Sequence, residues 1–222
     1  KMGRTLATLA GERGHEVVGV LGMDDNAEGA AIASYRARAD VAIEFTEPAA
    51  ALANVRACVQ AGLPVVTGTT GWYASLPVVT ADVMEHGGAL FWAPNFSLGV
   101  ALAIELARQM GHAFAGQPQF GVQLVETHHA AKKDAPSGTG AAMAAAASAG
   151  VGREVPITSI RVGHVPGTHT LVFDGPFEQV TLTHEARDRR VFADGALRAA
   201  EWLPGRVGVF TMRDLVRVQE ES

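Results

Sequence analysis

Short apolar runs alternate with segments of helical spacing through the first half of this chain, and this alternation limits its fold more than any other feature. The runs at 41–45 (VAIEF), 64–68 (PVVTG) and 89–92 (ALFW) have the length and composition of buried strands. Segments of roughly ten to fifteen residues with helical spacing separate them. Because strands that alternate with such helices form βαβ units, we expect a mostly parallel, doubly wound sheet with helices on both faces.

The start of this half has clear element boundaries. Residues 3–13 have apolar positions at helical spacing, and Gly14 ends that helix. EVVGVLG, which begins at Glu16, has the pattern of a buried strand. A later helix is expected from Pro48 to about Gln60.

The second half changes in character. A helix predicted from about Leu98 to Met110 precedes a strand at 120–129, and an alanine-rich helix follows. Two strand-like segments come next, at 159–173 and 179–189, joined by a turn. This order is typical of a small α+β domain with a mixed or antiparallel sheet.

The tail returns to helical patterning, with a helix at about 196–203, a Pro-Gly break and a short helical element at Met212. Its apolar residues are expected to pack on the first domain. We therefore predict one domain from residues 1–97 together with 192–222, and a second from residues 98–191.

Charge and cysteine content exclude several classes of function. The 222 residues carry a formal net charge of −5, which argues against general nucleic-acid binding and against an anionic membrane surface. The one cysteine, Cys58, excludes an internal disulfide framework, and its helical setting indicates a buried structural thiol. No signal peptide or bilayer-spanning segment is expected. We expect a cytoplasmic protein with a small-molecule ligand, and no nucleic-acid or membrane partner.

Residues suited to proton transfer gather in one string, ETHHAAKKDAPSGT, at 126–139. Lys132 and Lys133 are two of the chain's three lysines, and arginine supplies most of the other positive charge. Lysine can be tuned into a proton donor or acceptor, whereas arginine stays protonated. His128 and His129 titrate nearest neutrality. The string therefore predicts an acid/base site, although a solvated loop is the plainer interpretation of a charge run taken alone.

The end of the same string predicts a helix start. Ser137 or Thr139 can cap the alanine-rich helix that follows. A helix N-terminus presents unpaired N–H groups and a positive dipole end, so it can bind a carboxylate or phosphate.

The whole string resembles the signature of the dihydrodipicolinate reductase family, and the resemblance extends along nearly the whole chain. It implies a Rossmann-type dinucleotide-binding domain, a smaller α+β domain that binds substrate, NADH or NADPH as cofactor, and a homotetramer built through the second sheet. The family's substrate is a cyclic imine dicarboxylate, 4-hydroxy-tetrahydrodipicolinate, reduced on the diaminopimelate route to lysine.

The resemblance also implies roles for single residues. Lys132 matches the family's proton-donating lysine, and His128 its other acid/base residue. His129 would bind one substrate carboxylate. The other would be held at the helix start by Ser137, Gly138 and Thr139.

Three polar turns at the predicted strand ends are the expected cofactor site. They are EFTEP (44–48), GTTGW (68–72) and APNFS (93–97). Ligands of doubly wound domains bind beyond the carboxyl ends of the strands, although each turn alone is equally consistent with an ordinary connection. The turns resemble the family's dinucleotide-contacting loops, which implies contacts from Phe45, Thr46, Gly68, Thr69, Thr70, Ala93, Pro94, Asn95 and Phe96.

The first residues resemble the last part of the family's glycine-rich loop, with Lys1 and Met2 as cofactor contacts. We therefore expect an upstream segment of roughly 10 to 15 residues that supplies a strand and the first glycines. Asp24 is placed to accept hydrogen bonds from the adenosine ribose, which would favour NADH over NADPH. Asp25 competes for that role, and a capping or solvated role for both acids remains open.

Alternatives from other classes remain open. His164 and His169 could touch substrate, although structural histidines are the favoured interpretation, and no metal is expected because neither has a second ligand at a suitable spacing. One alternative is a different Rossmann-type oxidoreductase that acts on an aldehyde or a sugar. A semialdehyde dehydrogenase would need a nucleophilic cysteine in a loop, and Cys58 is poorly placed for that role. A catalytically inactive nucleotide-binding subunit would have no need of the proton donors His128 and Lys132.

Overall fold

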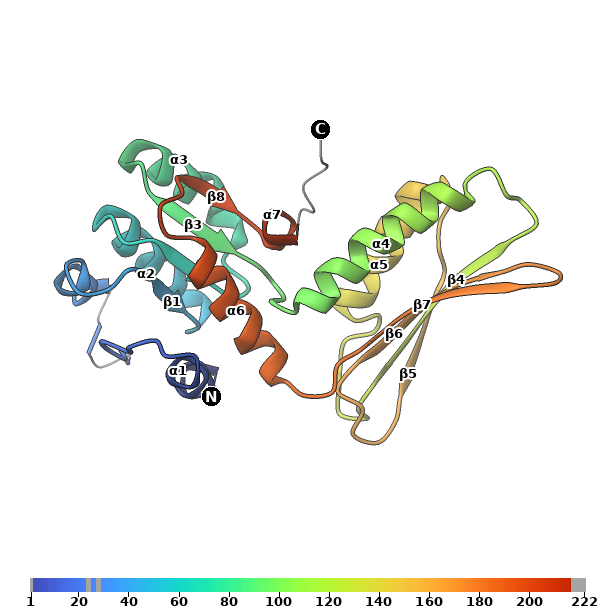
Figure 1. Ribbon diagram of the computed structural model, residues 1–222, viewed down its shortest axis with the longest axis horizontal. Coiled ribbons are helices and arrows are strands. Elements are labelled where there is room, and N and C mark those ends of the chain that lie inside the picture. Colours follow the sequence, from blue (N-terminus) through green and yellow to red (C-terminus); the bar gives the residue numbers. More distant parts are fainter. Residues whose placement is uncertain (1, 23–24, 27–28, 217–222) are drawn as a thin grey trace. The chain divides into compact units, whose positions relative to one another are not determined.

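The protein is described by a computed structural model, in which residues 2–22, 25–26 and 29–216 are placed (Figure 1). The chain forms two compact units. Unit 1 contains residues 1–96 and 192–222, and unit 2 contains residues 97–191. The chain therefore passes from unit 1 into unit 2 once and returns once.

A parallel sheet forms the centre of unit 1. Its strands lie in the order β1-β2-β3-β8, and every neighbouring pair is parallel. They are β1 (Ala42–Glu44), β2 (Val65–Thr67), β3 (Ala89–Trp92) and β8 (Gly208–Phe210). The first three are strands that the sequence predicted, and β8 is a three-residue, half-buried strand that it did not.

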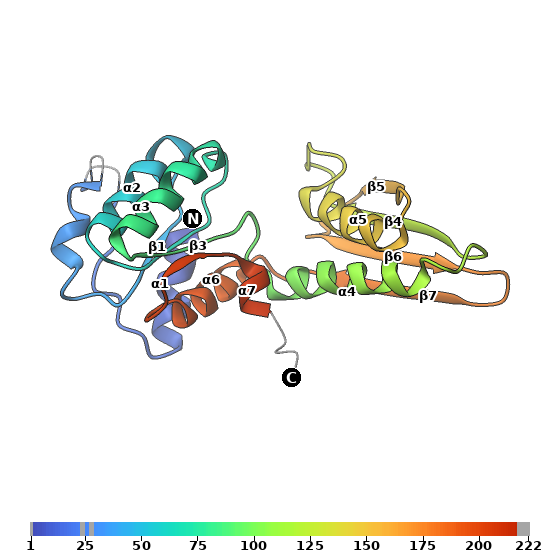
Figure 2. The same ribbon diagram turned by 90° about the horizontal axis from the view of Figure 1, so that it is seen from above.

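Helices cover both faces of this sheet. α2 (Pro48–Gln60) and α3 (Leu76–His86) lie on one face, and α1 (Met2–Glu12) and α6 (Arg190–Trp202) lie on the other (Figure 2). Short turns of helix complete the unit: η2 (Ile32–Tyr35), η3 (Tyr73–Ser75) and α7 (Met212–Val216). The fully buried core includes Val55, Val65, Val79, Val83 and Leu90. The doubly wound α/β prediction is confirmed.

The strand predicted from Glu16 is wrong. Residues 16–22 run without a ladder to any described strand, and Val17 and Val20 are 45% and 70% exposed. Apolar residues can suggest a strand, but a strand forms only where a neighbour satisfies its backbone groups. The segment has no such neighbour among the described residues.

Unit 2 is built on a mixed sheet in the order β5-β4-β6-β7. Its strands are β4 (Gly121–His128), β5 (Ile157–Arg161), β6 (Thr168–Asp174) and β7 (Gln179–Glu185). β4 and β5 are parallel, and the other two pairs are antiparallel. The predicted strand-like segment at 159–173 is divided between β5 and β6 by a turn that contains Gly163, at φ +53°. The expected α+β architecture is confirmed.

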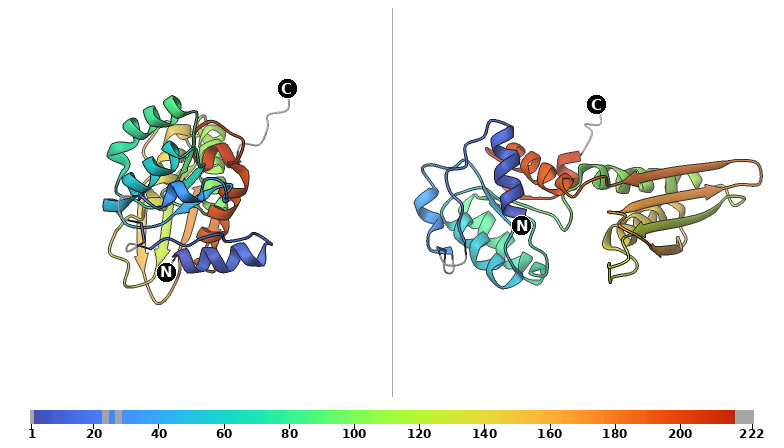
Figure 3. Two further views of the ribbon diagram at one scale, coloured as in Figure 1. Left: turned by 90° about the vertical axis from the view of Figure 1, so that its left-hand side faces the viewer. Right: turned by 90° about the horizontal axis from the view of Figure 1, so that it is seen from below.

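Two long helices cover one face of that sheet, as Figures 1 and 3 show. They are α4 (Leu98–Phe114) and α5 (Gly138–Val151). α5 consists largely of alanine and glycine, which lets the two backbones approach closely. A Cβ added at Gly150 would lie 2.5 Å from the carbonyl oxygen of Arg108 on α4. Small residues therefore set the distance between these helices, and the inner face of the sheet packs beneath them.

The part of the chain that the structure describes contains no helix that is both long enough and apolar enough to cross a membrane.

The contact between α6 and the turn after β3 gives a test of the unit 1 fold. A Cβ at Gly195 would lie 1.6 Å from the carbonyl oxygen of Phe96, whereas Gly11 on α1 has open space around it. We expect Gly195→Ala to lower the free energy of unfolding by about 1–3 kcal/mol or more, because backbone must move. Gly11→Ala should raise it by about 0.5–1 kcal/mol through helix propensity. Urea unfolding of both variants checks this, and equal effects would contradict the packing described.

Candidate active site

A polar cluster lies at one end of the inner face of the unit 2 sheet. Alternation along β4 turns Leu124, Glu126 and His128 toward the helices, and all three are buried. Strand register places Leu124 beside Ile157 and Leu171, which makes an apolar row. Register therefore also decides which groups surround the next inward residue, Glu126.

That next row is polar. Glu126 lies opposite Ser159 on β5 and His169 on β6, and His169 lies opposite His184 on β7. The row runs below the start of α5, because a Cβ at Gly140 would lie 3.3 Å from Cγ of Glu126. The side chains on the inner face of the sheet thus change from apolar to ionisable below the start of α5.

Glu126 is the centre of this cluster and has no exposed surface. Its Oε1 accepts from Nη2 of Arg161 at 2.7 Å and from the backbone N–H of Ser137 at 3.4 Å. Its Oε2 lies against Nδ1 of His128. Burial would raise the pKa of Glu126, but hydrogen bonds from Arg161 and Ser159 and the nearby positive charges outweigh it and lower the pKa to about 2.

Two buried imidazoles flank the carboxylate. Burial, with Lys132 and Arg161 adding to it, lowers the pKa of His128 against the opposing effect of Glu126. Burial, with His128 and His184 adding to it, lowers the pKa of His169 to about 4. The rings of His128 and His169 meet edge to face with centroids 5.1 Å apart. Both are therefore neutral near pH 7.

Ser137 joins this cluster to α5. Its Oγ accepts from the backbone N–H of Gly140 at 3.0 Å, so it caps the helix as the sequence suggested. The same oxygen lies 3.2 Å from Nε2 of His169. Ser137 is buried, whereas Gly138 is exposed and Thr139 half-buried. The hydroxyl of Ser137 thus shapes the helix start from within the protein.

The loop between β4 and α5 holds Lys132 near His128. Nζ of Lys132 binds the carboxylate of Asp134 at 2.7 and 2.8 Å, and this ammonium lowers the pKa of Asp134. The carbonyl of Asp134 accepts from Nη2 of Arg161 at 2.6 Å, which ties the loop to β5. Lys132 also acts electrostatically on His128. His129 is half-buried at the start of this loop, and Lys133 is exposed.

One group in the cluster has the spacing of metal ligands, which the sequence did not indicate. Ligand atoms of Glu126, His128 and His169 lie within 4.8 Å of one another. The guanidinium of Arg161 already neutralises Glu126, and His128 lies against the other carboxylate oxygen. The group is therefore accounted for as a buried ion-pair network. His164, the other candidate histidine, is exposed.

The expected cofactor turns lie together at the carboxyl edge of the unit 1 sheet. Glu44, which is buried, organises two of them: its carboxylate accepts from the hydroxyls of Thr46, Thr67 and Thr69. The backbone N–H of Thr46 donates to Oγ1 of Thr69 at 2.8 Å. A side chain at position 68 would displace the ring of Phe45, because a Cβ at Gly68 would lie 2.1 Å from that ring.

The other predicted residues of this edge differ in exposure. Phe45 contacts Phe96 with ring centroids 5.7 Å apart, which joins the first turn to the third. Ala93 and Phe96 are buried, so their side chains support the edge rather than face solvent. Thr70 and Pro94 are exposed, and Asn95 is half-buried.

Residues expected near the adenosine end of a cofactor are only partly described. Lys1 and Asp24 lie outside the described residues, and Met2 begins α1. Oδ2 of Asp25 accepts from the backbone N–H of Gly22 at 3.3 Å, a hydrogen bond within the loop itself. Nδ2 of Asn26 donates to Oδ1 of Asn54 at 2.9 Å, which fixes this loop to α2.

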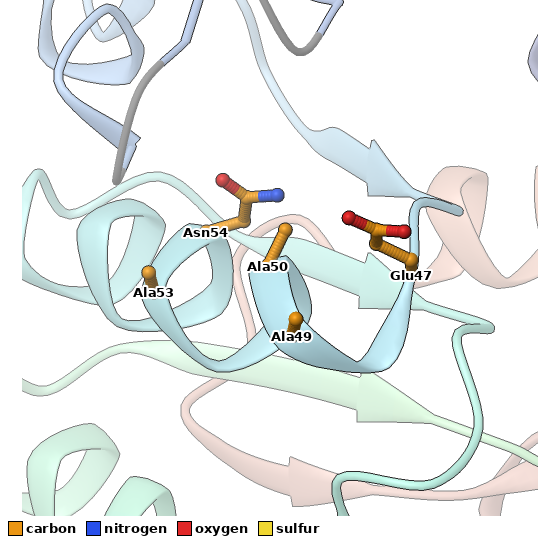
Figure 4. A pocket seen from close by; sticks show the side chains of 5 residues that line it. All are labelled: Glu47, Ala49, Ala50, Ala53 and Asn54. Carbon is orange, nitrogen blue, oxygen red and sulfur yellow. The ribbon is translucent and has the colours of Figure 1, made fainter.

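A pocket of about 250 Å³ lies along α2 beside this loop (Figure 4). Three alanines form its apolar floor, and two polar side chains border it. The lining residues are Glu47, Ala49, Ala50, Ala53 and Asn54.

Cys58 is buried on α2, and burial, with Glu44 adding to it, raises the pKa of its thiol to about 12. A thiol of this kind is almost wholly protonated at neutral pH and is a poor nucleophile. Covalent catalysis through this cysteine therefore lacks support.

Sequence reasoning missed three charged residues that organise the two sites: Glu44, Glu126 and Arg161. A signal existed for Glu126, because residues two apart on a strand share a face, and His128 was already a candidate. No comparable signal existed for Arg161, whose contact depends on the register of β4 against β5. Glu44 was not among the predicted contacts of the cofactor turns, yet its carboxylate holds the turns at 46 and 69.

Both halves of the chain match one known family. Residues 1–96 match "Dihydrodipicolinate reductase, N-terminus", and residues 99–216 match "Dihydrodipicolinate reductase, C-terminus".

Curated relatives and solved structures agree with this match. A 4-hydroxy-tetrahydrodipicolinate reductase of Christiangramia forsetii is 33% identical over 97% of this chain and 94% of its own length. One of Acidiphilium cryptum is 36% identical over 97% of this chain and 93% of its own length. A dipicolinate-bound dihydrodipicolinate reductase from Paenisporosarcina sp. TG-14 has the same fold, with a TM-score of 0.73 at 22% identity over 94% of this chain and 84% of that one.

The buried histidines predict an acid-sensitive unit 2. The pKa of His169 is about 4 in the folded state, below its ordinary 6.5, so the unfolded chain binds this proton more readily. The neutral His169 therefore contributes its full share of the folding stability above about pH 6.5, and this contribution is lost as the pH falls toward 4. We expect His169→Gln to flatten this dependence in urea unfolding measured from pH 7.5 to 4.5. His112→Gln, an exposed control on α4, should keep the wild-type slope, and equal slopes in all three proteins would contradict the assignment.

Proposed function

Because this chain belongs to the dihydrodipicolinate reductase family, we propose that it reduces 4-hydroxy-tetrahydrodipicolinate with a nicotinamide cofactor on the diaminopimelate route to lysine. The observation that carries the proposal is the cluster of unit 2. It combines a buried imidazole, a nearby lysine and a helix start within one loop and its flanking elements. A protein that only binds nucleotides has no use for this arrangement.

The carboxyl edge of unit 1 is suited to a dinucleotide. Parallel strands end there in three polar turns, and the buried carboxylate of Glu44 fixes two of them before any ligand arrives. The pocket along α2 would take the adenosine part, because its alanine floor suits a flat apolar ring and it adjoins the loop of Asp25 and Asn26. The nicotinamide, when bound, would supply a hydride.

The residues of unit 2 would bind the dicarboxylate and manage the proton. The exposed start of α5 at Gly138, with Thr139, would hold one substrate carboxylate, and His129 the other. Ser137 would contribute by shaping that helix start. Lys132 would donate a proton to the ring from its partly exposed position, and His128 would act as the second acid/base group.

Three further features belong to this proposal. Residues 1–97 with 192–222 would form the dinucleotide-binding domain, and residues 98–191 the substrate-binding domain. The molecule would be a homotetramer assembled through the unit 2 sheet. It would act in the cytoplasm on a small-molecule dicarboxylate.

The direct test is oxidation of NADH and NADPH, followed by absorbance, with substrate generated in situ from pyruvate and aspartate semialdehyde. Turnover that depends on both substrate precursors supports the reductase. A folded protein that binds cofactor in calorimetry yet oxidises neither would favour an inactive nucleotide-binding subunit.

Lys132→Arg tests the proton donor. The variant keeps the positive charge but loses a group able to give up a proton, so we expect kcat to fall about 10²-fold or more with a smaller change in KM. Lys133→Arg is the matched control, because that side chain is exposed one position away, and it should keep wild-type kcat. Equal turnover in both variants would remove Lys132 from the mechanism.

Asp24→Ala tests cofactor preference. A carboxylate beside the adenosine ribose repels a 2′-phosphate, so its removal should raise the kcat/KM ratio of NADPH to NADH by about tenfold, equivalent to about 1.4 kcal/mol. Glu85→Ala, at an exposed position on α3, should leave the ratio unchanged. An unaltered ratio in Asp24→Ala would mean that another group sets the preference.

A further inference from the structure

We propose that Glu126 is a positioning residue that fixes the imidazole of His128 with Nδ1 turned to the protein, which leaves Nε2 as the atom that exchanges a proton with substrate. This inference rests on the proposed function, because it assigns an orientation to the acid/base group of that same site. It adds a residue whose role neither the string at 126–139 nor the comparisons define.

The Nδ1 side of the ring is closed by Glu126. Oε2 of the carboxylate lies against Nδ1, and both atoms are wholly buried. A buried carboxylate that is ionised can accept a proton from Nδ1 but cannot donate one. The contact therefore favours the tautomer with the proton on Nδ1, as carboxylates do for other catalytic imidazoles.

A glycine lies beside the opposite nitrogen of the ring. Gly167 follows in register opposite His128, because Thr127 pairs with Thr168 in the antiparallel ladder. A Cβ at Gly167 would lie 3.0 Å from Nε2 of His128, and its φ of +153° also disfavours a side chain. The backbone just before β6 is thus shaped so that no side chain at position 167 covers Nε2.

Glu126 can play this role only while it is ionised, and its own partners ensure that. Arg161 and Ser159 donate to it from β5, and Ser137 donates from the start of α5. The same Nη2 atom of Arg161 also binds the carbonyl of Asp134, in the loop of Lys132. One carboxylate therefore holds the imidazole directly and the loop of the proton donor through Arg161.

The ionisable groups that face the imidazole of His128 determine how its pKa would respond to the loss of one charge. They are Glu126 on β4, Arg161 on β5, His169 on β6 and Lys132 in the following loop. Glu126 is the one among them that favours the protonated ring. Replacement by an amide should therefore lower the pKa of His128 and weaken its preference for the Nδ1–H tautomer.

The first test uses the wild-type protein and needs no activity. Nitrogen-15 NMR of the histidine side chains reports which nitrogen carries the proton, with His128 assigned by comparison with His128→Gln. We expect the Nδ1–H tautomer at pH 7.5. An Nε2–H tautomer in a folded protein would overturn the proposal whether or not the reductase activity is found.

The second test is Glu126→Gln, which keeps size and removes charge. We expect kcat to fall about 10²-fold with KM changed less than threefold, and the acidic limb of the kcat/KM profile to move to lower pH. The NMR titration of His128 should move in the same direction. Glu105→Gln, which breaks a Glu–Arg pair on α4 in the same unit, should keep the wild-type kcat and profile.

The outcomes separate this inference from the proposed function. Active wild-type enzyme with an unchanged kcat and pH profile in Glu126→Gln would overturn the positioning role and leave the reductase standing. An inactive wild-type protein that shows the Nδ1–H tautomer would overturn the reductase and leave the orientation of His128 standing. If Glu126→Gln fails to fold, Gly167→Ala replaces it. A methyl group beside Nε2 of His128 should lower kcat while the Nδ1–H tautomer persists. An unchanged kcat would count against Nε2 as the atom that exchanges a proton with substrate.

Discussion

The arrangement of unit 2 depends on the burial of one negative charge. A carboxylate removed from water costs several kcal/mol unless partners surround it, and Glu126 has no exposed surface. Its guanidinium partner on β5, its contact with His128 and the N–H at the start of α5 come from three different elements. The charge can therefore be accommodated only when β4, β5 and α5 are correctly assembled, which couples the geometry of the site to the fold.

Unit 1 uses a related solution with weaker partners. Glu44 is also buried at the end of a strand, but hydroxyl groups and a backbone N–H satisfy it instead of a guanidinium. Both carboxylates stand where a strand enters a loop that carries ligand-binding candidates. Neutral donors suit a turn that is proposed to receive a phosphate-bearing cofactor, because a cation already paired within the protein would not be available to the ligand. A guanidinium in unit 2 instead offsets a charge that lies beside a titrating imidazole.

The sequence predicted the elements of this protein better than the contacts between them. α2 begins and ends where Pro48 and Gln60 were expected, because a proline start and helical spacing are local signals. The strand from Glu16 was wrong because a strand also needs a neighbour, and β8 was missed because three half-buried residues leave little pattern. Family membership predicted from residues 126–139 is confirmed by matches to both halves. Arg161 escaped notice because strand register, which no local pattern encodes, brings it to Glu126.

The two proton-bearing groups of the proposed site have opposite surroundings, and this difference assigns their roles. His128 is buried and its pKa is lowered, so it is neutral at pH 7 and ready to accept a proton. Lys132 is partly exposed and paired with an exposed carboxylate, so as the proposed donor it would be within reach of solvent protons. A buried donor would have to be recharged through the protein, whereas a donor at the surface of the loop needs no such path. The surroundings therefore favour Lys132 as the donor and His128 as the group whose orientation must be fixed from within.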